Sequence, residues 1–132
     1  MNKSRIDQFL REITDWAFTR PDLLALAVVG SHARGVASPT SDLDLVMIAT
    51  DPAPYLHNTD WVHQFGMVEK QQIEDYGLLT SLRVWYTAGP EVEFGLTDER
   101  WAALPLDEGT RRVMDDGMRV LIDKDHILTR HQ

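Results

Sequence analysis

The stretch that decides the fold is VVGSHARGVASPTSDLDLVMI, Val28 to Ile48, in which a Gly-Ser turn and two aspartates lie between two apolar runs. The first run, Leu23 to Val29, is continuously aliphatic and ends at Gly30, which predicts a buried strand followed by a turn. The second run, Leu43 to Ile48, predicts another buried strand. Residues 31–36 between them predict a short helix that begins directly after the turn.

The two aspartates lie at the start of the second predicted strand. Side chains two positions apart in a strand point to the same face, so Asp42 and Asp44 project together while Leu43 and Leu45 enter the core. Adjacent carboxylates repel each other unless a cation lies between them, and Mg²⁺ prefers such oxygen ligands. Mg²⁺ bound in this way keeps open positions that substrate phosphates can fill. An ordinary half-exposed strand shows the same alternation, so this pattern alone leaves both interpretations open.

The Gly-Ser turn lies where the first strand ends. Gly30 lets backbone N–H groups approach an anion closely, and the helix that follows directs the positive end of its dipole to the same point. The hydroxyl of Ser31 is a further donor. Taken alone, the dipeptide is equally consistent with a simple turn.

The joint arrangement is more specific, because Gly30-Ser31 is followed by ten residues and then by Asp42-x-Asp44, with a predicted strand on each side. It resembles the signature of the nucleotidyltransferase superfamily that includes DNA polymerase beta, and in particular its small bacterial members, the minimal nucleotidyltransferases and the aminoglycoside adenylyltransferases. The fold-level resemblance covers about residues 23–96 and is weaker beyond. The matching positions are Gly30, Ser31, Arg34, Gly35, Ser41, Asp42 and Asp44.

This resemblance implies a nucleotide site with two magnesium ions. Gly30 and Ser31 would hold the β and γ phosphates of a nucleoside triphosphate, with ATP as the expected substrate because the small members of the superfamily mostly use it. Asp42 and Asp44 would carry the two Mg²⁺ ions, together with a third carboxylate on a later strand.

The candidate for the third carboxylate lies in the stretch GPEVEFGL. Glu91 and Glu93 alternate with apolar residues and face the same way, so either could reach the metals. Glu93 is preferred, also as the candidate general base, because it lies inside the strand whereas Glu91 follows Pro90. Both glutamates could instead be surface residues of an edge strand.

Two further residues belong to the candidate nucleotide site. Arg34 could offset charge on the triphosphate, although an arginine in a loop is often only solvated. Ser41 directly precedes the aspartate pair and completes the match to the superfamily signature.

The rest of the chain alternates between helical and strand-like segments, which predicts a single α/β (α+β) domain over residues 1–132. We expect the nucleotidyltransferase fold, with a mixed sheet of about five strands and helices mainly on one face. The strands at 78–86 and 91–96 should pair antiparallel. The other predicted segments are a helix at 4–19, a loop at 50–54, helical turns at 58–65, strands at 67–74 and 118–122, helical stretches at 97–103 and 107–115, and a charged tail at 123–132.

Composition limits the partners and the compartment. The 21 acidic residues against 13 basic ones give a net charge of −8, which disfavours a polynucleotide partner. No apolar run approaches the roughly 20 residues that a membrane span needs, and the N-terminal segment has the pattern of an amphipathic helix. Because cysteine is absent as well, we expect a cytoplasmic protein.

The resemblance implies an enzyme that transfers a nucleoside monophosphate, by default AMP from ATP, to a hydroxyl group and releases pyrophosphate. The acceptor stays open between a protein, such as a partner toxin, and a small molecule, and a homodimer could complete the site. The alternative is a non-catalytic nucleotide-binding or interaction module, similar to an antitoxin, that retains the fold. The carboxylates Asp42, Asp44 and Glu93 favour activity, because they destabilise a site that binds no metal.

Overall fold

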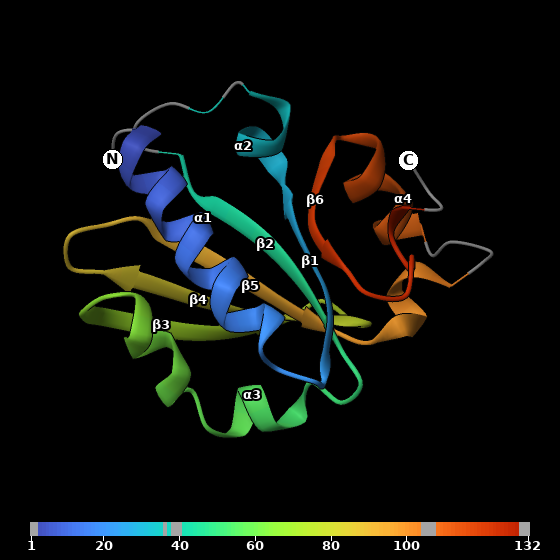
Figure 1. The fold of residues 1–132 in the computed structure, drawn as a ribbon, viewed down its shortest axis with the longest axis horizontal. Coiled ribbons are helices and arrows are strands. Elements are labelled where there is room, and N and C mark those ends of the chain that lie inside the picture. The colour runs from blue at the N-terminus through green and yellow to red at the C-terminus, as the bar shows by residue number, and fades with distance from the viewer. Residues whose placement is uncertain (1–2, 36, 38–40, 104–107, 130–132) are drawn as a thin grey trace.

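The computed structural model describes residues 3–35, 37, 41–103 and 108–129 of the chain. The expected mixed sheet is confirmed and has six strands in the order β3-β4-β5-β2-β1-β6 (Figure 1). The elements in chain order are α1 (Lys3–Phe18), β1 (Leu23–Val29), α2 (Gly30–Arg34), β2 (Leu43–Ala49), α3 (Ala53–His57), the 3-10 helix η1 (Asp60–Phe65), β3 (Val68–Asp75), β4 (Leu79–Tyr86), β5 (Glu91–Thr97), the 3-10 helix η2 (Glu99–Ala102), α4 (Glu108–Asp115) and β6 (Met118–Asp123).

The sheet consists of two antiparallel halves that meet at a parallel pair. β4 pairs antiparallel with both β3 and β5, as the sequence predicts for β4 and β5. β1 pairs antiparallel with both β2 and β6. Between the halves, β2 and β5 run parallel, and this is the one parallel pair among the strands described. The parallel seam therefore brings the predicted aspartate strand next to the predicted glutamate strand.

One face of the sheet packs against α1, with η1 and α3 beside it (Figure 1). Phe9 and Ile13 of α1 are buried against the sheet, because apolar residues at helical spacing form a single stripe on the helix. Trp61 of η1 stacks on Trp16 of α1 with ring centroids 5.2 Å apart. Leu43 and Leu45 join this larger core, so the residues that alternate with them on β2 point to the opposite face.

Over β1 and parts of β2 and β6, the opposite face is covered by η2, α4 and the segment after β6 (Figure 1). Trp101 of η2 is buried there as a member of a smaller apolar cluster. All seven residues of β1 are buried, since this strand has both faces covered. The remainder of this face, over β4 and β5, carries the polar residues of the candidate site.

Two local predictions are wrong. The segment after β6 is not a solvated charged tail over residues 123–129, because Ile127 and Leu128 are buried and the Asp123 carboxylate accepts their backbone N–H groups. The predicted loop at 50–54 contains the start of α3, where proline suits the first turn of a helix and Asp51 accepts the N–H of Ala53. Residues 36 and 107, at the ends of two predicted helices, lie outside the described residues.

None of the described helices combines the length and the apolar character that crossing a membrane would require.

Candidate active site

The parallel register places Asp44 of β2 directly beside Glu93 of β5. The preceding residues, Leu43 and Val92, also pair. Asp42 and Glu91, one residue further toward the N-termini, therefore lie together at the end of the β2–β5 pair. Each strand alternates apolar and acidic residues here, and both acidic pairs point to the face away from α1. Asp44 and Glu93, referred to below as the carboxylate pair, form the inner part of the site.

Asp44 is the most strongly perturbed acid of the site. Burial is the main cause that raises its pKa to about 7, followed by a hydrogen bond to Glu93 and the negative charges of Glu93 and Asp42, while Arg83 opposes the shift. Within the described part of the chain, Oδ1 of Asp44 has no hydrogen-bond partner although it is buried. A buried carboxylate oxygen without a donor costs stability, and a bound cation would satisfy it.

Gly30 closes the site from the side of the Gly-Ser turn. It begins α2 with a φ of +72°, and a Cβ atom at this position would lie 2.5 Å from Oδ2 of Asp44. Real Cβ atoms essentially never come so close to another atom, so residue 30 has to be glycine if Asp44 keeps its place. The turn and the aspartate strand are therefore in direct contact.

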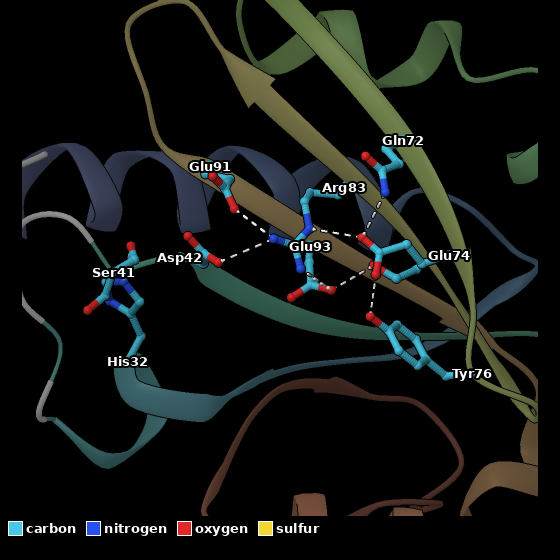
Figure 2. A network of polar contacts seen from close by, with 10 residues as sticks. His32, Ser41, Asp42, Gln72, Glu74, Tyr76, Arg83, Glu91 and Glu93 are labelled. Atoms are coloured by element: carbon cyan, nitrogen blue, oxygen red, sulfur yellow. Dashed lines mark hydrogen bonds and ion pairs between the residues drawn. The ribbon is translucent and has the colours of Figure 1, made fainter.

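A guanidinium group lies at the centre of the site (Figure 2). Arg83 of β4 pairs with Glu93 across the β4–β5 ladder, and its Nη2 lies 3.2 Å from Oε1 of Glu93. Its Nη1 donates to Oε2 of Glu91 at 3.0 Å and lies 3.8 Å from Oδ2 of Asp42. Its Nε lies 3.4 Å from Oε1 of Glu74 on β3. One arginine thus contacts four carboxylates from three segments of the chain.

Residues on β3 and β4, and Tyr76 between these strands, orient two glutamates of this network. The Ser81 hydroxyl donates to Oε1 of Glu93 at 3.0 Å, so this oxygen accepts from Ser81 and contacts Arg83 at once. Glu74 accepts from the amide of Gln72 and from the phenol of Tyr76. These contacts restrict the orientation of both glutamates.

The remaining predicted residues lie at the rim. A ring nitrogen of His32 in α2 lies 3.4 Å from the carbonyl oxygen of Ser41, which links α2 to the residue before Asp42 (Figure 2). Arg34 is exposed and donates to the backbone carbonyl of Asp116 at 3.4 Å, next to the turn between α4 and β6. The described contacts therefore hold Arg34 at this turn, and its role toward a triphosphate stays a prediction.

A small cavity of about 220 Å³ adjoins the carboxylate pair. It extends from Asp44 and Glu93 toward the C-terminal ends of β2 and β5, and α4 contributes to its wall. Its walls combine apolar side chains with carboxylates and hydroxyl groups. They comprise Val29, Gly30, Asp44, Leu45, Val46, Tyr76, Leu79, Ser81, Glu93, Gly95, Val113 and Asp116.

The donor set suits a hard divalent cation that is shared with phosphates. Asp44 presents an unsatisfied buried oxygen, and Glu93 lies beside it, which matches the one or two carboxylates that Mg²⁺ usually takes from a protein. As the side chains stand, no three His, Asp or Glu residues in the described ranges converge on one point. Arg83 explains this in part, because Glu93, Glu91 and Asp42 each direct an oxygen toward its guanidinium.

The comparison with known families identifies a nucleotidyltransferase, because a family model of adenylyltransferases matches nearly the whole chain. Its fold is similar to that of an aminoglycoside 6-adenyltransferase from Bacillus subtilis, with a TM-score of 0.59 and 16% sequence identity. The chain belongs to the streptomycin adenylyltransferase family, whose model matches residues 4–132. The aligned region covers 77% of this chain and 37% of the Bacillus enzyme, so the chain spans well under half the length of that relative.

A terminal uridylyl transferase 4 from Trypanosoma brucei matches more weakly, with a TM-score of 0.45 and 17% identity over 70% of this chain and 35% of that enzyme. No curated protein is similar enough in sequence to count as a match.

Sequence reasoning missed the supporting residues of the site. The motif that identifies the candidate site in the sequence includes none of Arg83, Ser81, Glu74 and Tyr76. The alternation of β4 predicts that Ser81 and Arg83 share a face. The register with β5, which brings them to Glu93, is a tertiary property.

Proposed function

We propose that the protein is an adenylyltransferase that depends on Mg²⁺ and transfers AMP from ATP to a hydroxyl group. The observation that carries this proposal is the carboxylate pair, Asp44 and Glu93, in which Asp44 lies directly against the Gly-Ser turn at Gly30. Membership of the streptomycin adenylyltransferase family supports the same class of reaction.

In this proposal, Gly30 and Ser31 bind the β and γ phosphates of ATP, with Ser41 and Arg34 at the rim of the same site. Asp42, Asp44 and Glu93 would hold up to two Mg²⁺ ions. When bound, Mg²⁺ would offset the charge of the triphosphate and lower the pKa of the acceptor hydroxyl.

The transfer forms one bond and breaks one. The acceptor oxygen attacks the α-phosphorus, the bond from this phosphorus to the oxygen that bridges the α and β phosphates breaks, and pyrophosphate leaves. Glu93 takes the hydroxyl proton. Ser81 and Arg83 hold Oε1 of Glu93 at 3.0 and 3.2 Å, which keeps the carboxylate in one orientation toward the reacting group.

The acceptor reaches the carboxylate pair through the adjoining cavity. Its volume of about 220 Å³ lies below the roughly 300–1,000 Å³ of pockets that enclose a whole drug-sized ligand. We therefore expect that only the reacting part of the acceptor enters. Asp116 lines this cavity outside the proposed magnesium site, which favours an acceptor that carries an amino group near its hydroxyl. Because the family is that of streptomycin adenylyltransferases, an aminoglycoside is the first acceptor to test.

The test uses purified protein, Mg²⁺ and ATP labelled at the α-phosphate, incubated with a panel of aminoglycosides or with lysate of the source cells. The products are separated into protein and small-molecule fractions. Asp44→Asn is the inactive variant, and Asp60→Asn is the matched control, because Asp60 is exposed on η1 at the opposite face of the sheet.

Label on an aminoglycoside that is absent with Asp44→Asn supports the proposal with a small-molecule acceptor. Label on a protein supports transfer with a protein acceptor, such as a toxin partner or a second copy of the chain. If ATP binds and no acceptor is labelled by either the wild type or Asp60→Asn, the protein is a binding module and the proposal fails.

A further inference from the structure

Arg83 occupies the position at which the acidic residues of the site converge. It contacts Asp42, Glu74, Glu91 and Glu93 at 3.0 to 3.8 Å. These four carboxylates and Asp44 are referred to below as the acidic cluster. Arg83 lies outside the Gly-Ser and Asp-x-Asp motif, and the transfer reaction as derived above needs it only to orient Glu93.

Several contacts hold the guanidinium group, although within the described residues its buried Nε has no hydrogen-bond partner. Its side chain is 24% exposed, and its Cζ lies 5.8 Å from the centre of the Trp85 ring. Glu74, which contacts Nε, is itself held by hydrogen bonds from Gln72 and Tyr76. Because a guanidinium is planar, it loses less side-chain conformational entropy for each contact that it forms than the flexible, strongly hydrated side chain of a lysine would.

The charges of the cluster are unequal. Five carboxylates face one guanidinium, so a negative excess remains that attracts a further cation. The same guanidinium takes up oxygens of Asp42 and Glu93 that a divalent cation would use. Arg83 and a divalent cation therefore compete for Glu93 and Asp42.

We propose that Arg83 is the resident counter-ion of the acidic cluster, which holds Asp42, Glu91 and Glu93 together without metal and weakens the binding of a free divalent cation. This competition sets the order in which the ligands bind. A divalent cation binds tightly only when it brings further ligands, such as the phosphates of the nucleotide, so it enters together with ATP. This inference rests on the proposed function only in assuming that the cluster binds a divalent cation.

The experiment titrates the protein with Mn²⁺ and follows the free ion by electron paramagnetic resonance, with no nucleotide or acceptor present. The variants are Arg83→Gln, which removes the charge, and Arg83→Lys, which keeps the charge but loses the planar fork. The matched control is Arg112→Gln, since Arg112 is exposed and pairs with Glu108 on α4 within one helix turn.

We expect Arg83→Gln to bind Mn²⁺ about tenfold more tightly than the wild type, since removing one close unit charge at a partly buried site is worth a factor of this order. Arg83→Lys should lie between the two. Arg112→Gln should match the wild type, although its net charge changes by the same amount. In addition, thermal unfolding without metal should show Arg83→Gln to be less stable than Arg112→Gln, with a larger gain on adding Mn²⁺.

A role limited to folding predicts lower stability without any gain in Mn²⁺ affinity. Unchanged or weaker Mn²⁺ binding in Arg83→Gln would therefore overturn the proposal. If Arg83→Gln does not fold, Arg83→Lys serves as the test. A Mn²⁺ affinity of Arg83→Lys no higher than that of the wild type would contradict the competition between Arg83 and the cation.

Measurements on Asp44→Asn distinguish a failure of the counter-ion role of Arg83 from a failure of the proposed function. Loss of Mn²⁺ binding in Asp44→Asn is expected. Retained binding would show that the metal lies elsewhere and would reject the proposed catalytic site together with the role of Arg83. By contrast, tighter binding in Arg83→Gln without any detectable transfer would support the counter-ion role and count against the activity alone.

Discussion

Asp44 and Glu93 lie side by side on two parallel strands that are joined by residues 50–90, and both are acidic and face the open side of the sheet. Burial and the neighbouring Glu93 make the charged form of Asp44 more costly and raise its pKa to about 7.

The first prediction concerns the pH dependence of stability without metal. The ordinary pKa of Asp44 is 3.8, so between this value and about 7 the folded protein holds a proton that the unfolded chain releases. The free energy of unfolding should therefore fall as the pH rises through this interval and level off above it. Thermal unfolding in EDTA, followed from about pH 5 to about pH 8, measures this fall.

Asp44→Asn should remove most of this pH dependence and stabilise the metal-free protein at neutral pH by about 1–2 kcal/mol, a value reduced for the partial solvent exposure of the group. Asp60→Asn, which changes an exposed aspartate, should keep the wild-type profile. An Asp44→Asn profile parallel to that of the wild type would contradict the prediction.

The second prediction distinguishes the two candidate glutamates. Glu93→Gln should lower the rate of transfer by about 10²–10⁴-fold, because it removes the proton acceptor beside Asp44. Glu91→Gln should lower the rate far less, since Glu91 lies beside Asp42 at the outer end of the seam and contacts Arg83. Single-turnover rates with saturating ATP provide the comparison. Equal losses in the two variants would assign both glutamates to the reaction.

The third prediction tests the contact between the turn and the aspartate strand. Gly30→Ala would place a Cβ atom 2.5 Å from Oδ2 of Asp44, whereas Gly35→Ala meets no described atom within 4 Å. Both glycines have a φ of +72°, so both substitutions carry the same backbone strain of about 1 kcal/mol or more.

Only Gly30→Ala should also displace Asp44 and weaken Mn²⁺ binding. Thermal unfolding and Mn²⁺ titration of both variants measure the two effects separately. Mn²⁺ binding that is equal in the two variants would show that Asp44 does not depend on the space at residue 30.

The fourth prediction concerns the segment after β6. The Asp123 carboxylate accepts the backbone N–H groups of Ile127, Leu128 and Thr129 at 2.7 to 2.9 Å. Although burial opposes the effect, these hydrogen bonds lower the pKa of Asp123. Asp123→Asn should destabilise the protein by about 1–3 kcal/mol, because it replaces a charged acceptor of three hydrogen bonds.

Because the pKa of Asp123 is lower in the folded protein than in the unfolded chain, ionised Asp123 adds to the free energy of unfolding. This stabilisation is fully present above the pKa of the unfolded chain and is lost as the pH falls through the pKa of the folded protein. Thermal unfolding at neutral pH, with exposed Asp125→Asn as the control, tests the effect. Equal melting temperatures for the two variants would contradict it.

The sequence predicts the local parts of this structure well and their assembly only in part. The aliphatic runs specify β1 and β2, and period-two alternation correctly places Asp42 and Asp44 on the face away from the core. The same alternation puts Glu91 and Glu93 on one face. That β2 and β5 are neighbours, and parallel, depends on contacts distant in sequence that no local pattern encodes.

The misplaced parts have a common physical origin. Arg83 has the pattern of any exposed strand residue until the β4–β5 register sets it against Glu93. The segment after β6 has a charged composition, but its two consecutive apolar residues, Ile127 and Leu128, find a partly covered sheet face to bury against. In both cases tertiary packing decides the environment of a residue whose local sequence is ambiguous.

The parallel seam has a further consequence for dynamics. Along the chain, the three-stranded meander from β3 to β5 lies between β2 and β6. In the sheet it forms one end, and it pairs with the other half along the β2–β5 seam. A cation shared by Asp44 and Glu93 would add a cross-link between the two halves. Amide hydrogen exchange should therefore slow on both sides of the seam when a cation binds, so that the meander opens with the rest of the sheet and not as a separate cooperative unit.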